Sequence, residues 1–158
     1  MSLIVVDASV AAKWCLPAKG ETLTDEAFRL LRRYVKGEIQ FVVPDLFWAE
    51  LGNLLWKAVR QGRCAKTEAD TALTSLKEHN LPTVPSLSVL DLAFGIATTF
   101  DRTVYDSLYV ALAVHSKAQF ITADEKLASA VAAHLPVKWL GTLRSPCSLY
   151  RGKNCGWC

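Results

Sequence analysis

The sequence predicts an α/β fold in which helices cover both faces of a parallel sheet. One observation is a set of short, almost wholly apolar runs such as Leu3 to Val6, which are typical of strands buried on both faces. The other is that longer stretches with apolar residues at helical spacing lie between these runs. Strand and helix units that alternate along a chain indicate a parallel sheet between two helical layers.

Five strands are expected. The first, Leu3 to Val6, is apolar and rich in β-branched residues, so it should be central in the sheet. The other four expected strands are Phe41–Val43, Pro82–Pro85, Gln119–Thr122 and Val137–Leu140.

The first two expected helices have clear end signals. One covers Ser9 to Leu16 and stops at Pro17, which cannot continue a hydrogen-bonded turn. The next covers Glu21 to Lys36, and Gly37 supplies its C-terminal cap.

The third expected helix begins after Pro44, with Asp45 as its N-cap, and ends at Gly62. The same periodicity predicts the remaining helices, which are Thr67–His79, Ser86 or Ser88 to Phe100, Asp106–Ser116 and Asp124–His134.

Length and composition indicate one compact domain. The chain has 158 residues, of which 51% are hydrophobic and 21% charged, and its net charge of +3 is too small to argue for a nucleic-acid partner. No apolar run is long enough to cross a bilayer, and Met1 leads directly into a strand, so we expect a cytoplasmic protein without a membrane partner.

The C-terminal segment differs from the rest of the chain. Residues 144–158 show no apolar periodicity and hold three of the five cysteines, two of them in Cys155-Gly-Trp-Cys158. A structural zinc site needs four ligands, and no histidine lies near these three. We expect the domain to be residues 1–143 and the remainder to be a disordered or added tail.

Four acidic residues stand at the expected ends of strands or in helices. Asp7 and Asp124 each follow a strand directly, Asp106 begins a helix and Glu50 lies within one. In a parallel sheet, ligands bind beyond the carboxyl ends of the strands, where the strand order reverses. If the first and fourth strands are neighbours, Asp7 and Asp124 face each other there.

Each acid also has a structural interpretation. Asp7, Asp106 and Asp124 could each be an N-cap, and taken singly this is the simpler explanation. Glu50 lies among apolar neighbours, where an unpaired buried carboxylate would be costly, although an exposed position remains open.

Supporting polar residues favour a shared site. Ser9 follows Asp7 by two positions, Thr122 precedes Asp124 by two, and Asn53 lies on the same helical face as Glu50. Carboxylates are ligands that Mg²⁺ and Mn²⁺ prefer, whereas the three histidines are dispersed. The sequence therefore predicts a magnesium- or manganese-dependent site, whose natural substrate is a phosphodiester.

Four short motifs in order resemble those of PIN domains of the VapC toxin type. They are Ile4–Val10, the Glu50-x-x-Asn53 helix, Val104–Ala113 and Phe120–Leu127. The resemblance covers about residues 2–143, and its most specific part is Tyr105-Asp106-x-x-Tyr109-x-x-Leu112-Ala113 followed by Thr122-x-Asp124.

The resemblance implies a three-layer α/β/α fold with five parallel strands in the order 3-2-1-4-5. It also implies an endoribonuclease that acts as the toxin of a toxin–antitoxin pair, with an antitoxin partner, a homodimeric state and RNA as substrate. Asp7 and Asp106 would be the main Mg²⁺ or Mn²⁺ ligands, Glu50 would complete the site, and Asp124 would hold a second ion or position water. Ser9, Asn53 and Thr122 would support them.

Three other functions are alternatives to this one. A dehalogenase-like phosphotransfer domain needs a second acid where Ser9 stands, and a receiver needs an acceptor Asp after its third strand; neither is present. A nuclease of the same fold that works in RNA processing or decay stays open. A non-catalytic binding module is disfavoured by the complete set of acids.

The sequence also predicts two features of the surface. The first and third helices carry more large apolar residues than one side of a small sheet needs, which favours a partner interface; the residues are Trp14, Leu16, Phe47, Trp48 and Trp56. Substrate is expected to be steered by Lys13, Arg60 or Arg102.

Overall fold

A computed structural model of the chain describes residues 1–143. Its five strands form one parallel sheet in the order β3-β2-β1-β4-β5, as expected. The strands are β1 (Ser2–Val6), β2 (Ile39–Pro44), β3 (Thr83–Val84), β4 (Gln119–Thr122) and β5 (Val137–Trp139). The order reverses at β1, so the carboxyl ends of β1 and β4 lie next to each other.

Seven α-helices and two short 3₁₀ turns connect the strands within these residues. The helices are α1 (Ala8–Cys15), α2 (Thr24–Val35), α3 (Leu46–Arg60), α4 (Lys66–Glu78), α5 (Leu90–Phe100), α6 (Val104–His115) and α7 (Glu125–Val131). The 3₁₀ turns are η1 (Ser86–Val89) and η2 (Leu140–Leu143).

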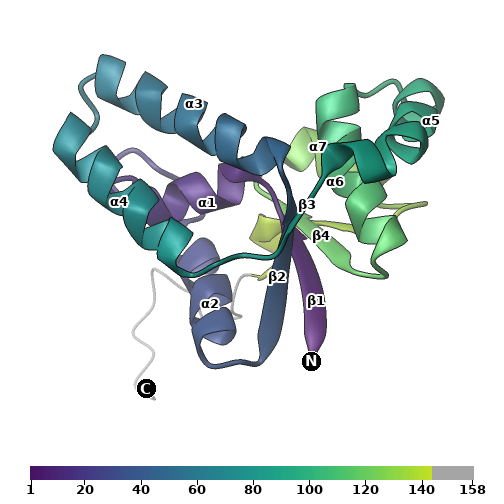
Figure 1. The fold of residues 1–158 in the computed structure, drawn as a ribbon, viewed down its shortest axis with the longest axis horizontal. Coiled ribbons are helices and arrows are strands. Elements are labelled where there is room, and N and C mark those ends of the chain that lie inside the picture. Colours follow the sequence, from purple (N-terminus) through teal and green to yellow (C-terminus); the bar gives the residue numbers. More distant parts are fainter. Residues whose placement is uncertain (144–158) are drawn as a thin grey trace, which may run out of the picture.

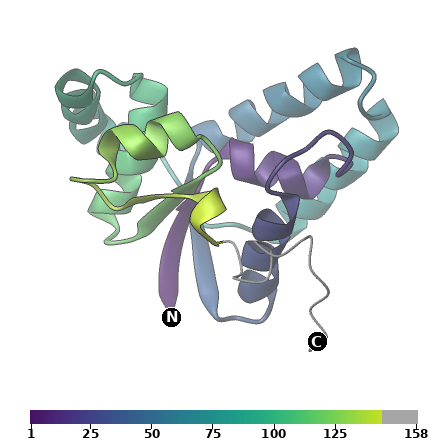
Figure 2. The same ribbon diagram turned by 180° about the vertical axis from the view of Figure 1, so that it is seen from behind.

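The helices form two groups on either side of the central strands. Helices α1 to α4 gather on one side of β1 and β2, and α5 to α7 on the other (Figure 1), an arrangement that the view from behind repeats (Figure 2). Helix α6 contacts three strands, whereas α3 packs mainly on α1 and α4. The three expected layers are therefore present.

The central strand β1 lies in the core of the fold. Ile4, Val5 and Val6 are all buried, because β1 has a strand on each side and helices over both faces. Burial of a Val or Ile side chain contributes about 1.5–3 kcal/mol to the stability of the folded state, so this short strand contributes strongly to the core.

Most expected boundaries agree with the structure, and the differences have local causes. Helix α6 starts at Val104 because the Thr103 hydroxyl accepts a hydrogen bond from the Asp106 N–H at 3.1 Å. The proposed capping role of Asp106 is therefore wrong. Asp45 does precede α3, but its carboxylate accepts hydrogen bonds from the N–H and hydroxyl of Ser86 instead of capping α3.

The tail predicted at residues 144–158 lies outside the described residues, so this boundary stays a prediction. Within residues 1–143, no helix is both long and apolar enough to span a bilayer.

The predicted apolar interface on α1 and α3 is mostly wrong. Phe47 and Leu16 are buried, and Trp14 and Trp48 are partly buried against the core. Of these five residues, only Trp56, which is 51% exposed, is open to a partner.

The different burial of Phe47 and Trp56 predicts different effects on stability. Phe47→Ala should lower the free energy of unfolding by about 3–5 kcal/mol, because it empties a fully buried position. Trp56→Ala, on the exposed side of the same helix, should change it by less than about 1 kcal/mol. Urea unfolding followed by circular dichroism measures both, and equal losses would contradict this assignment of the core.

Candidate active site

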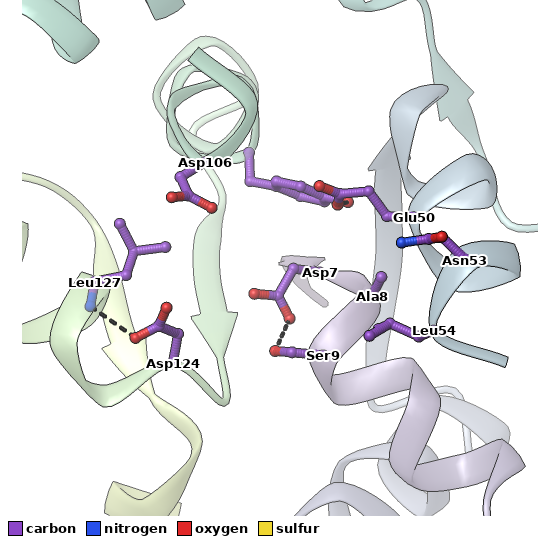
Figure 3. A pocket seen from close by; sticks show the side chains of 10 residues that line it. Asp7, Ala8, Ser9, Glu50, Asn53, Leu54, Asp106, Asp124 and Leu127 are labelled. Carbon is purple, nitrogen blue, oxygen red and sulfur yellow. Dashed lines mark hydrogen bonds between the residues drawn. The ribbon is translucent and has the colours of Figure 1, made fainter. Parts of the chain in front are cut away.

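Four carboxylates line one pocket at the carboxyl edge of the sheet. Asp7, Glu50, Asp106 and Asp124 all border it, together with Ser9 and Asn53. Figure 3 shows Asp106 and Asp124 on one side, Glu50 and Asn53 on the other, and Asp7 between them. These six residues come from four parts of the chain that are far apart in sequence: the β1–α1 junction, α3, α6 and the β4–α7 junction. The predicted gathering of the acids is present.

Asp7 is the most enclosed of the four acids, with 9% of its surface exposed. It caps α1, since its Oδ1 accepts a hydrogen bond from the Val10 N–H at 3.1 Å. The Ser9 hydroxyl donates to the same oxygen, and the Thr122 hydroxyl donates to Oδ2. Asp7 is thus both a cap and a pocket residue, so the two interpretations of this acid are compatible.

Ser9 and Thr122 also join β1 to β4. Besides donating to Asp7, the Ser9 hydroxyl accepts from the Ala123 N–H at 3.2 Å, and the Thr122 hydroxyl accepts from the Asp124 N–H at 3.0 Å. Thr122 is completely buried. The two hydroxyls therefore hold the start of α1 and the end of β4 in a single hydrogen-bonded unit.

Asp124 combines a cap with an open carboxylate. Its Oδ1 accepts from the Leu127 N–H at 3.0 Å, which starts α7, and the side chain is exposed at the pocket (Figure 3). Asp106 lies on the first turn of α6 and is partly exposed. Thr103 provides the cap of that helix, so the carboxylate of Asp106 is available to the pocket.

Glu50 is held by a residue to which the sequence analysis gave no role. The Tyr109 hydroxyl donates to Glu50 Oε2 across the pocket. Tyr109 is buried and stacks on Phe120, with ring centroids 5.6 Å apart. The signal that could have identified it is its position three residues after Asp106, one turn along the same helix face.

Burial and mutual repulsion shift the protonation equilibria of these groups. Burial raises the pKa of Asp7; hydrogen bonds from Ser9, Thr122 and Val10 offset part of this, and the charge of Asp106 raises it further. Burial also raises the pKa of Glu50, against the Tyr109 hydrogen bond, and the charges of Asp7 and Asp106 add to the rise. Burial and the bond to Glu50 raise the pKa of Tyr109, so its hydroxyl keeps its proton.

The donors in this pocket fit a hard cation. They are four carboxylates, the hydroxyls of Ser9 and Tyr109 and the amide of Asn53, and no histidine or cysteine lines the pocket. Within residues 1–143, no three acidic, histidine or cysteine side chains are close enough together to hold an ion as they stand. Burial is the main cause of the raised pKa values of Asp7 and Glu50, and the charge of Asp106 adds to both. An ion held by three or more of these side chains would require them to rotate.

The three supporting residues differ in how closely they contact the acids. Ser9 and Thr122 contact Asp7 directly, as described above, whereas Asn53 is exposed at the rim. The three histidines lie elsewhere, with His79 at the end of α4 and His115 at the end of α6.

Charge repulsion among the acids predicts that one substitution stabilises the protein. In metal-free buffer at pH 7, Asp106→Asn should raise the free energy of unfolding by about 1 kcal/mol, because a charge that raises the pKa of both Asp7 and Glu50 is removed. The gain should shrink as the pH falls and the raised-pKa acids of the wild type become protonated. Added Mg²⁺ should reverse it.

Asp91→Asn is the matched control for this comparison. Asp91 also lies in the first turn of a helix, α5, but away from the pocket, so its substitution removes the favourable helix-dipole interaction without relieving repulsion. Thermal melts of the three proteins at several pH values provide the test. If Asp106→Asn melts no higher than Asp91→Asn without metal, the acids do not repel one another appreciably.

Comparison with known proteins agrees with this geometry. Residues 4–133 match the PIN domain family. Ribonuclease VapC3 of Pyrobaculum aerophilum is 34% identical to the chain over 127 residues, which cover 79% of this chain and 92% of that protein.

Solved structures share the fold at low sequence identity. VapC20 of Mycobacterium tuberculosis, described as a sarcin-ricin loop cleaving toxin, superposes with a TM-score of 0.59 and 16% identity over 81% of this chain and 95% of its own. A toxin–antitoxin complex from Klebsiella pneumoniae gives a TM-score of 0.55 and 14% identity over 87% and 96% of the two chains. The family match and the curated relative each span most of the chain, and the chain belongs to the PIN-domain family.

Proposed function

We propose that this protein is a magnesium- or manganese-dependent endoribonuclease and the toxin of a toxin–antitoxin pair that acts in the cytoplasm. The observation that carries the proposal is the gathering of Asp7, Glu50, Asp106 and Asp124 on one pocket. The relationship to a protein named as a ribonuclease supports RNA as the substrate.

The ligand assignment follows from position and protonation. Asp7 and Asp106 are the proposed main ligands, because Asp7 is fixed by its hydrogen bonds and Asp106 already interacts with it through space. Glu50 would complete the site by turning from Tyr109, and Asp124 would contribute its exposed oxygen. When bound, the ion activates water and stabilises negative charge on the attacking and leaving oxygens of a phosphodiester.

The protein groups favour hydrolysis by water over attack by a side chain. Ser9 is the only hydroxyl or thiol side chain besides Tyr109 among the residues lining the pocket. Its oxygen is already engaged with Asp7 and the Ala123 N–H. Burial raises the pKa of the Tyr109 hydroxyl, which makes it a poor nucleophile.

The proposed antitoxin has one exposed apolar surface to contact on α3. Trp56 lines an apolar groove between α3 and α4, with Leu55, Val59 and Leu73. A solved toxin–antitoxin complex that shares this fold supports a partner of this kind. The homodimer stays a prediction, for which the exposed Leu87, Phe94 and Tyr105 provide apolar surface.

Substitution of Asp7 tests the catalytic proposal. Asp7→Asn should reduce the rate of RNA cleavage by about a hundredfold or more while the far-UV circular dichroism stays unchanged, because the shape is kept and the charge is lost. EDTA should abolish wild-type cleavage, and Mg²⁺ or Mn²⁺ should restore it. Asp91→Asn, distant from the pocket, is the control. Cleavage by Asp7→Asn at the wild-type rate would show that this pocket is not the active site.

Expression in a bacterial host tests the toxin assignment. We expect the wild-type chain alone to arrest growth and the Asp7→Asn chain, produced in equal amount, to be harmless. Growth curves and immunoblots provide the measurement. Harmless overproduction of a protein that cleaves RNA in vitro would instead favour a nuclease of RNA processing or decay.

A further inference from the structure

A second pocket adjoins the acidic pocket and has the opposite charge. It is lined by Lys13, Lys57 and Arg63 along with Glu21 and Gln61. The two pockets share Ser9, Leu54 and Asp124, which lie along the lower side of the site in Figure 3. The acidic pocket, by contrast, has no lysine or arginine among its lining residues.

Glu21 brings two of these cations together from distant parts of the chain. Lys13 Nζ lies 3.1 Å from Glu21 Oε2, and the Arg63 guanidinium bonds the other carboxylate oxygen. Lys13 is buried on α1, while Arg63 belongs to the turn between α3 and α4. Burial alone would raise the pKa of Glu21, but its bonds to Arg63 and Lys13 lower it, so the carboxylate stays ionised.

Lys57 adds a third cation that the fold does not neutralise. Its side chain is exposed on α3 and forms no hydrogen bond or ion pair with any residue in the described part of the chain. Three cations thus outnumber the two carboxylates of this pocket, Glu21 and the shared Asp124. An ion-pair network needed only for stability would explain Lys13, Glu21 and Arg63, but it gives no reason for an unpaired Lys57 beside them.

One face of α3 connects the two pockets. Glu50 and Asn53 line the acidic pocket, Leu54 lines both, and Lys57 and Gln61 line the basic one. Their spacing of three or four residues places them on one stripe of the helix. A bound chain that follows this stripe would pass from the acidic pocket directly into the basic one.

We propose that the basic pocket binds the backbone phosphate of an RNA nucleotide next to the bond that is cut in the acidic pocket. The proposal rests on the ribonuclease function proposed above. Without a cation the acidic pocket repels phosphate, so an adjoining group of lysine and arginine side chains is needed to hold the strand. The pocket volume of about 440 Å³ is within the range of ligand sites, roughly 300–1,000 Å³.

The test is the salt dependence of RNA binding in metal-free buffer, where cleavage does not interfere. Binding of a fluorescein-labelled single-stranded oligoribonucleotide is followed by fluorescence anisotropy at several salt concentrations. Lys57→Ala should weaken binding about fivefold and lower the slope of log Kd against log salt by about 0.7, as expected for one lost phosphate contact. Lys57→Arg should restore both values. Arg63→Ala should act in the same direction as Lys57→Ala.

Lys138→Ala is the control for a general loss of charge. Lys138 is an exposed lysine of β5 that lines a hollow with Ser2 and Gln119, at the starts of strands and away from both pockets. Its substitution should leave the affinity and the slope unchanged.

In steady-state cleavage with Mg²⁺, Lys57→Ala should raise KM with kcat unchanged, since the contact is made equally in the ground and transition states.

The outcomes separate this proposal from the proposed function. An unchanged slope in Lys57→Ala, an equal loss in Lys138→Ala, or no measurable binding of RNA by the wild type would overturn the phosphate pocket. An unchanged RNA affinity with weakened antitoxin binding would assign the pocket to the protein partner instead. If the slope falls as expected but the wild type cleaves no RNA with any divalent ion, the pocket stands and the catalytic proposal fails.

Discussion

The proposed active site depends on holding like-charged carboxylates around one pocket at the edge of a parallel sheet. Asp7 is the centre of this arrangement because it is buried and accepts three hydrogen bonds, from Ser9, Val10 and Thr122. These bonds stabilise the ionised form, yet they do not fully offset burial, and the pKa of Asp7 remains raised. A bound cation would offset both the burial of Asp7 and the charge of Asp106, which is why we propose a metal ion in this pocket.

The hydrogen bonds that position Asp7 also organise the sheet around it. Ser9 and Thr122 each donate to Asp7 and accept from the backbone after β4, so the junction of β1 and β4 forms as one unit. Asp7 and Asp124 each cap a helix with one oxygen and still face the pocket. Structural and chemical roles are therefore combined in the same side chains, and neither role excludes the other.

Charge is distributed over this surface in a way that suits a polyanion. In the proposed function the acidic pocket would need a cation before it accepts a phosphate, whereas the adjoining basic pocket has lysine and arginine side chains of its own. Helix α3 borders both pockets and is anchored by the buried Phe47 and Leu51, so its polar stripe has a rigid base. The net charge of +3 is a sum over the whole chain and does not show this local separation of charge.

The sequence by itself determined the layers, the five strands and the acids at strand ends, because apolar runs, helical periodicity and strand-end positions are local properties. It could not place the Glu50–Tyr109 bond or the Arg63–Glu21 pair, whose partners are 59 and 42 residues apart. It also misjudged the buried Phe47 as an interface residue alongside the exposed Trp56, since helical spacing does not say which neighbours cover a residue. Only the tertiary structure decided these points, because burial and long-range contacts arise from packing between segments and not from the segments themselves.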